Sequence, residues 1–71
     1  NAVGPGPIRT GMTAAIPEED KQKFARRRVP ERRYAEPEEV AHGILHLALP
    51  ASSYITGHLL MVDGGMTIKN N

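Results

Sequence analysis

The chain contains no cysteine and no tryptophan, and its formal net charge is only +1. The absence of cysteine excludes a disulfide framework. It also fits a reducing compartment, so we expect the protein in the cytoplasm. A charge near zero gives no general attraction to nucleic acid or to acidic membranes. No apolar run approaches the roughly 20 residues that a membrane-spanning helix needs, so we expect neither nucleic acid nor a membrane as partner.

The chain is also short. A chain of 71 residues is at most one small domain, and such a domain buries only roughly 60% of its unfolded surface. Without disulfides its stability would be marginal. The chain begins at Asn1, inside what reads as a strand. We therefore expect it to be a piece of a larger protein.

A loop rich in proline and glycine, Pro5-Gly6-Pro7-Ile8-Arg9-Thr10, follows the strand expected at residues 1–3. Its prolines fix backbone torsions, and Gly6 allows another molecule to approach bare main chain. The Thr10 hydroxyl can hydrogen-bond what lies there. Strand ends of open α/β sheets are where ligands bind, so this loop is a candidate site. A plain surface turn is the alternative.

Two helices are expected, each opened by a proline and an acidic first turn. The first spans 17–28 and ends on three arginines, so its charges complement the helix dipole, but its apolar face is poor. The second spans 37–49 and carries an apolar stripe at helical spacing. Gly43 weakens this helix by roughly 1 kcal/mol relative to alanine, which favours a role in close packing.

The run Leu59-Leu60-Met61-Val62 predicts a strand buried on both faces, as in a parallel sheet. The order strand, helix, helix, strand favours a parallel, right-handed connection. Asp63 precedes two glycines, so we expect its carboxylate to cap a turn. Tyr54 is expected to pack before the strand, with a partner for its hydroxyl. Covering both faces of the sheet requires other protein or self-association.

Two polar patterns each allow a functional and a simpler interpretation. His42 and His46 have a spacing that can bind zinc, but a site needs three or four ligands, which favours a polar helix face. The arginines at 26–28, 32 and 33 could hold phosphates. Their acidic flanks instead favour a solvated helix end. Contact with an acidic substrate or carrier protein stays open as a subsidiary hypothesis.

Taken together, three stretches resemble the short-chain dehydrogenase/reductase family: the loop 5–10, the segment 37–41, and the segment 51–58 that runs into Val62-Asp63-Gly64-Gly65. The resemblance covers nearly the whole chain. It implies the C-terminal strand-helix-helix-strand part of a doubly wound parallel, Rossmann-like α/β sheet, incomplete in this chain. Ketoacyl-carrier-protein reductases and sugar-alcohol dehydrogenases are the nearest types.

The resemblance implies an NAD- or NADP-dependent enzyme that moves a hydride between nicotinamide and a carbonyl or alcohol substrate. Pro5 and Gly6 would border the nicotinamide. The backbone of Ile8 would pair with its carboxamide. Thr10 would hydrogen-bond the carboxamide or the pyrophosphate. The residues that choose NAD or NADP lie outside the matched motifs.

The resemblance also divides the chain into three parts. Residues 1–11 would form the cofactor-edge loop, 12–36 a substrate-covering segment, and 37–71 the long helix and last strand. Segments 37–49 and 59–62 would form the surface through which many members associate as tetramers. A homo-oligomer is therefore expected.

The family's catalytic motifs are not found here. Gly4 and Gly6 have the first spacing of a phosphate loop, but Arg9 stands where the third glycine belongs. The family pairs a tyrosine with a lysine four residues later. Here Tyr34 and Tyr54 are followed at that distance by Glu38 and His58. We assign no catalytic residue and expect the 71-residue chain alone to be inactive. The alternative is a truncated, non-catalytic module for subunit interaction.

Overall fold

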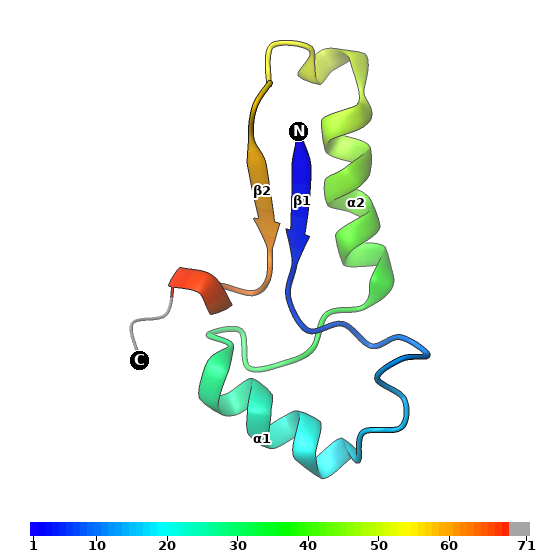
Figure 1. Cartoon of the computed structure of the whole chain (residues 1–71), viewed down its shortest axis with the longest axis vertical. Coiled ribbons are helices and arrows are strands. Elements are labelled where there is room, and N and C mark those ends of the chain that lie inside the picture. The colour runs from blue at the N-terminus through cyan, green and yellow to red at the C-terminus, as the bar shows by residue number, and fades with distance from the viewer. Residues whose placement is uncertain (69–71) are drawn as a thin grey trace.

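The computed structural model describes residues 1–68 and has the predicted order of strand, helix, helix and strand. The elements are β1 (Ala2–Pro5), α1 (Glu18–Arg28), α2 (Pro37–Ala48) and β2 (Leu59–Val62), with 3₁₀ turns at Pro50–Ser52 and Met66–Ile68. Figure 1 shows the two strands side by side, α2 along them, and α1 across their lower ends. The last residues of the predicted segment 37–71 lie outside the described part.

The two strands are parallel, as predicted, with Ala2 opposite Leu59 and Pro5 opposite Val62. The predicted end of β1 at Val3 was wrong, because the strand continues through Gly4 and Pro5. The N–H groups of Ala2 and Gly6 donate to β2 or its flanks. Alternate residues direct their N–H away from the partner strand, so Pro5 has no donor to lose there.

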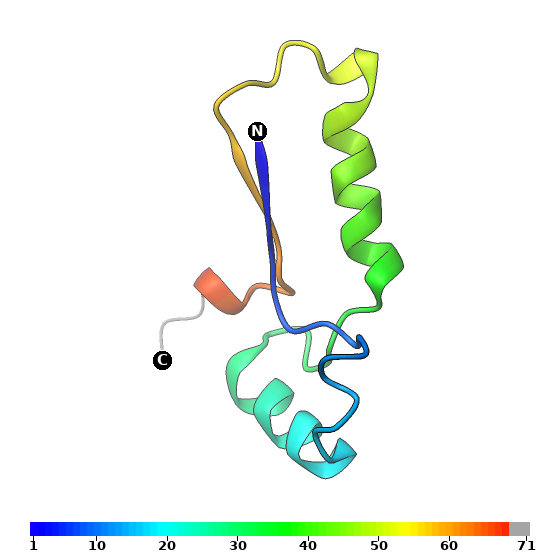
Figure 2. The same ribbon diagram turned by 45° about the vertical axis from the view of Figure 1, so that its right-hand side comes forward.

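Helix α2 covers one face of this small sheet (Figure 2). Gly43 is its buried residue, and a Cβ built there would lie 3.0 Å from Val62 Cγ2 and 3.6 Å from Leu60 Cδ2. The predicted close-packing role of Gly43 is confirmed. The molecule measures 42 × 29 × 14 Å, so it is thin in one direction, as a single helix layer on a single sheet layer requires.

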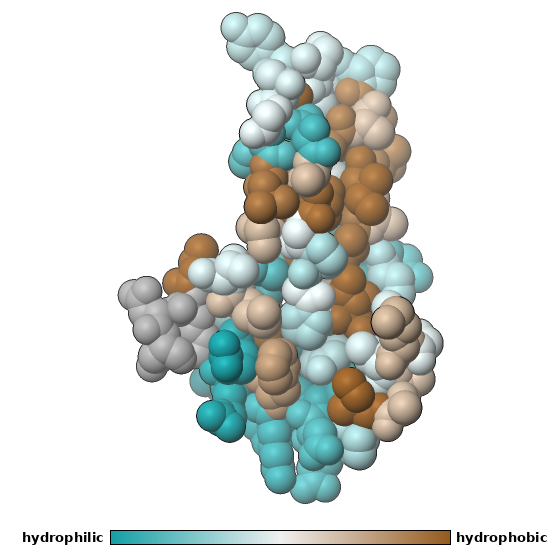
Figure 3. All heavy atoms as spheres, in the orientation of Figure 1, coloured by the Kyte–Doolittle hydropathy of each residue, from teal (hydrophilic) through white to brown (hydrophobic). Residues whose placement is uncertain are grey.

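No helix or strand of residues 1–68 covers the opposite face of the sheet. Leu59 and Met61 alternate with the half-buried Leu60 and Val62, and they remain 55% and 40% exposed. Burial of β2 on both faces is therefore not achieved by the described residues. Figure 3 shows the hydrophobic surface gathered over the strands and α2, with hydrophilic surface around α1.

Helix α1 is a surface element with few anchors, as its poor apolar face predicts. Ala25 and Val29 are buried, whereas Phe24 is 40% exposed and meets Tyr34 edge-on at a centroid distance of 6.3 Å. Pro17 caps the helix in an extended conformation and is not its first residue, which corrects the expected start by one position.

The structure also corrects the expectation for Tyr54. Its side chain is fully exposed, and in the described part of the chain its hydroxyl makes no hydrogen bond. The turn before β2 is instead held by Ser52, whose hydroxyl donates to the His46 carbonyl and whose own carbonyl accepts from Ile55. These local bonds close the turn without Tyr54.

Candidate functional site

The carboxyl ends of β1 and β2 meet at one edge of the sheet, and two loops leave from there. Loop 5–10 follows β1, and the turn 63–65 follows β2. Parallel strands bring such loops together at the edge where ligands bind in open α/β sheets. The structure therefore places the predicted loop at a sheet edge suited to a ligand.

Gly6 fills a structural need within this chain. Its N–H donates to the Val62 carbonyl at 3.1 Å, which extends the strand pairing by one residue. A Cβ built on Gly6 would lie 2.8 Å from both Cα and Cβ of Asp63. The missing side chain lets the two loops touch, a reason the sequence did not reveal. The expected approach of another molecule to Gly6, and to the neighbouring exposed Pro5, stays a prediction.

Asp63 caps the turn after β2, as predicted. Its carboxylate accepts the N–H of Gly65 and of Thr67, both at 3.0 Å, and the Thr67 hydroxyl at 2.7 Å. The hydroxyl bond, together with the two backbone bonds, holds the pKa of Asp63 below its usual value. The turn is thereby fixed against Gly6.

Ile8 lies at a short parallel bridge with Ala35. The N–H of Arg9 donates to the Ala35 carbonyl at 2.9 Å, and the N–H of Ala35 donates to the Pro7 carbonyl at 2.9 Å. Both bonds flank Ile8, so its own N–H and C=O face the other side of the loop. The carbonyl accepts the Thr13 hydroxyl at 2.8 Å. The N–H makes no hydrogen bond within residues 1–68.

Thr10 lies two residues further along the same loop. Its N–H donates to Thr13 Oγ1 at 2.9 Å, which fixes the backbone. Its side chain is exposed, and its hydroxyl has no hydrogen-bond partner among the described residues. The N–H of Ile8 and the hydroxyl of Thr10 therefore lack a hydrogen-bond partner among residues 1–68, whereas the N–H groups of Gly6, Arg9 and Thr10 on the same loop are bonded. A carboxamide, which carries both a donor and an acceptor, is chemically suited to this pair.

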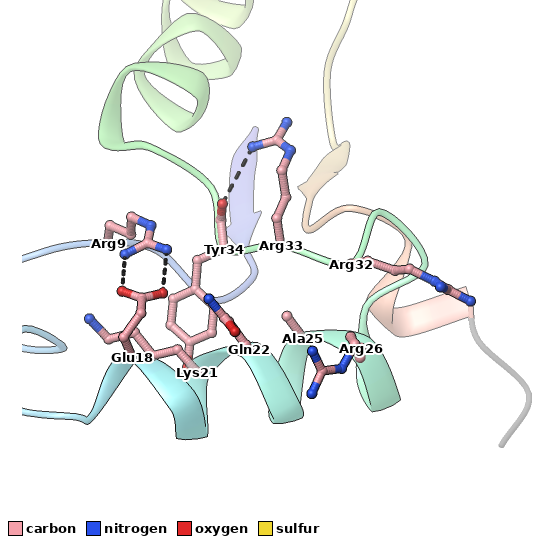
Figure 4. A pocket seen from close by; sticks show the side chains of 9 residues that line it. All are labelled: Arg9, Glu18, Lys21, Gln22, Ala25, Arg26, Arg32, Arg33 and Tyr34. Carbon is pink, nitrogen blue, oxygen red and sulfur yellow. Dashed lines mark hydrogen bonds and ion pairs between the residues drawn. The ribbon is translucent and has the colours of Figure 1, made fainter.

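Arg9, between these two residues, makes a contact that the sequence did not predict. Its guanidinium donates to the two carboxylate oxygens of Glu18 at 2.8 and 2.7 Å (Figure 4). A carboxylate oxygen of Glu36 lies 3.8 Å from Arg9 Nε. Hydrogen bonding between the partners raises the pKa of Arg9 and lowers the pKa of Glu18. No local spacing rule links residues nine apart, so the sequence carried no signal for it.

An open cavity of about 400 Å³ lies between α1 and the connector that follows it, and Figure 4 shows the side chains that line it. Several cationic side chains line it, but Arg26, Arg32 and Arg33 point in different directions. Arg33 turns toward α2, where it binds both carboxylate oxygens of Glu39 at 2.8 Å. A phosphate site requires guanidinium groups that converge on one point, and these do not.

The described residues 1–68 contain no cluster of three or more side chains suited to a metal ion. Across the same residues, no helix has both the length and the apolar character that crossing a membrane requires.

Comparison with known proteins finds relatives along nearly the whole chain. The family model described as enoyl-(acyl carrier protein) reductase matches residues 1–67. The chain is 50% identical over 66 residues to a 3-oxoacyl-[acyl-carrier-protein] reductase of Aquifex aeolicus, which covers 93% of this chain and 26% of the relative.

Two further relatives carry other names. The identity is 47% over 68 residues with carbonyl reductase family member 4 of Xenopus laevis, covering 96% of this chain and 26% of the relative. The identity is 48% over 65 residues with an acetoacetyl-CoA reductase of Synechocystis, covering 90% of this chain and 27% of the relative. The chain thus spans about a quarter of the length of the curated relatives it matches.

Proposed function

The chain belongs to the short-chain dehydrogenase/reductase family, and on that premise we propose that it is the C-terminal part of an NAD(P)-dependent oxidoreductase. The full-length enzyme would transfer a hydride between nicotinamide and a carbonyl or alcohol substrate. Within it, residues 1–11 would supply the cofactor edge, 12–36 the substrate cover, and 37–71 the long helix and last strand.

One observation carries this proposal: the open Ile8 N–H and Thr10 hydroxyl lie on a loop whose other backbone N–H groups, those of Gly6, Arg9 and Thr10, are already bonded. The Ile8 N–H would donate to the carboxamide oxygen of the nicotinamide. The Thr10 hydroxyl would bind the carboxamide or the pyrophosphate. When bound, the cofactor supplies the hydride. The loop's part is to fix the ring's orientation at the sheet edge, because orientation lowers the entropic cost of reaction.

The names of the relatives support a carbonyl substrate. They describe proteins that act on 3-oxoacyl and acetoacetyl groups, or that are named as carbonyl reductases. We propose the same substrate class for the enzyme that contains this chain. The proton-transferring residues would lie in another part of that enzyme, so the isolated chain should show no turnover.

The uncovered apolar surface supports a role in assembly. Ile44 and Leu45 on α2 are 54% and 56% exposed, and Leu59 and Met61 form the open face of β2. We propose that segments 37–49 and 59–62 pack against the rest of the enzyme and a second copy, giving a homo-oligomer. The same surface favours the second candidate function, a non-catalytic module that binds other subunits.

The test uses the full-length polypeptide that contains this chain. Purified protein is titrated with NADH and with NADPH by fluorescence, and the oxidation of each is followed with an acetoacetyl thioester. The proposal predicts binding of at least one cofactor and its oxidation only when the carbonyl substrate is present. Absence of binding to either nicotinamide cofactor would contradict it. Binding to partner subunits without cofactor binding would favour the second candidate.

A further inference from the structure

Residues 10–34 form an excursion that leaves the sheet edge and returns to it. The excursion begins after Arg9 and ends at Ala35, where the two chain segments pair beside Ile8. Between these points the chain carries α1, which lies apart from α2 and the strands (Figure 1). Its buried apolar side chains are only Ala25 and Val29. So small a core leaves the excursion dependent on its contacts with the sheet edge. These are the contacts near its ends and the bond from the Glu31 N–H to the Gly64 carbonyl at 3.2 Å.

Arg9 contacts both the point where the excursion returns and the start of α1 within it. Its N–H donates to the Ala35 carbonyl at 2.9 Å, where the excursion returns. Its guanidinium binds both oxygens of Glu18, the first residue of α1, and lies 3.8 Å from Glu36, which precedes α2. A planar guanidinium matches two carboxylate oxygens better than a lysine could. Figure 4 shows the two bonds running in parallel between the loop and the start of α1.

We propose that Arg9 is a positioning residue, a clasp that couples α1 to the loop at Ile8 and Thr10 through Glu18, at the start of α1, and Glu36, just after the excursion. This inference rests on the proposed function for its consequence, because the coupled loop is the proposed cofactor edge. Breaking the Arg9–Glu18 pair makes the excursion more mobile. The Ile8 N–H and the Thr10 hydroxyl, on either side of Arg9, then become more mobile as well.

The chain offers a matched control. Lys23 and Glu19 form another ion pair of α1, at 3.5 Å, and both of its members belong to the same helix. Replacing Lys23 by glutamine removes one positive charge, as replacing Arg9 by glutamine does. The Lys23 variant, however, breaks no contact between α1 and the sheet edge. A general effect of charge would appear in both variants.

The experiment compares Arg9→Gln, Glu18→Gln, the double variant and Lys23→Gln in the full-length protein. Amide hydrogen exchange is measured by NMR at Arg9 and Ala35, whose N–H groups hold the junction. Exposed ion pairs are weak, so we expect exchange to rise about two- to fivefold in each single variant. The double variant should be no faster than the singles, and Lys23→Gln should match the wild type. High salt should shrink the difference.

The functional arm measures cofactor KM and kcat in the same variants. We expect KM to rise about two- to fivefold in both single variants and in the double variant, with kcat unchanged. Unchanged exchange, an effect of only one partner, multiplying effects in the double variant, or an equal effect of Lys23→Gln would overturn the inference. If the wild type binds no nicotinamide cofactor, the proposed function fails, and the exchange arm still decides whether Arg9 is the clasp.

Discussion

At the residue scale, the loop after β1 carries two kinds of group: those that make contacts within the chain and those that have no partner there. Gly6 and the carbonyl of Ile8 make contacts within the chain, to Asp63 and Thr13. The Ile8 N–H and the Thr10 hydroxyl make none among residues 1–68. A loop held by its own bonds can present the remaining groups at fixed positions, which reduces the entropic cost of binding a ligand.

Replacing Thr10 by valine tests the open hydroxyl. The change keeps the shape of the side chain and removes one hydrogen bond to the cofactor, worth about 0.5–1.5 kcal/mol, so cofactor KM should rise about two- to twelvefold. Steady-state kinetics of the full-length enzyme measures this. Thr56→Val is the control, because Thr56 is also exposed but lies before β2, at the opposite ends of the strands. An unchanged KM in Thr10→Val counts against the assigned role.

Replacing Gly6 by alanine tests the contact between the two loops. The new Cβ would lie 2.8 Å from the Asp63 backbone, which must shift. We expect a loss of about 1–3 kcal/mol in the free energy of unfolding, as is usual for overpacking. Gly11→Ala is the matched control, since a Cβ there meets nothing within 4 Å. Denaturant titration of the full-length protein, without cofactor, compares them. Equal stability of both variants would show that Gly6 is not needed for packing.

At the element scale, α2 is anchored more firmly than α1. The carboxylate of Glu39 in its first turn accepts both Arg33 donors and the N–H of Glu36 at 2.9 Å. The bonds from Arg33, followed by the one from Glu36, lower the pKa of Glu39 to about 2. One carboxylate thus caps α2 and fixes the connector before it.

This arrangement predicts a pH dependence. Folding lowers the pKa of Glu39, so its ionised carboxylate stabilises the folded state. This stabilisation is fully present above the ordinary pKa of 4.5 and is lost as the pH falls toward about 2. Carbon NMR of the Glu39 carboxyl in the folded full-length protein should show a midpoint near pH 2. Arg33→Gln should move the midpoint upward. A wild-type midpoint near 4.5 would mean that the Arg33 pair does not form in solution.

Sequence patterns predicted elements well where local rules apply. The apolar stripe and Pro37 predicted α2, and the run before Asp63 predicted β2 and its turn. Local rules failed where a distant partner decides. β1 runs on to Pro5 because β2 lies beside it. The expectation for Tyr54 failed for a local reason, since the bond from Ser52 to the His46 carbonyl closes the turn without it. The assignment of loop 5–10 to the cofactor edge came from the resemblance and stays a prediction. The Arg9–Glu18 pair could not be predicted, because it depends on the folded path of the chain.

At the scale of the whole molecule, the apolar surface exceeds what the described residues bury. Among residues 1–68, only Ala25 and Val29 are buried apolar side chains, while large ones on α2 and β2 are about half exposed. The edge of β1 away from β2 also pairs with no strand of residues 1–68. Exposed apolar faces and open strand edges are sites where more protein packs.

The proposed subunit surface can be tested by introducing a charged side chain into it. Leu45→Glu places a carboxylate on the exposed stripe of α2, and we expect the full-length protein to sediment as smaller species at micromolar concentration. Burying an unpaired charge in an interface costs several kcal/mol. Met12→Glu is the control, because Met12 is an exposed apolar residue outside the proposed surface. Unchanged assembly in Leu45→Glu would exclude this part of α2 from the interface.

The most direct test is the thermal melt of residues 1–71 alone, followed by circular dichroism and calorimetry on protein shown by sedimentation to be monomeric. A segment that depends on the rest of a nucleotide-binding fold to cover its sheet should lose signal gradually, without a heat-absorption peak. A sharp, cooperative transition of the monomer would contradict the account, because it would show that these residues form a self-sufficient fold.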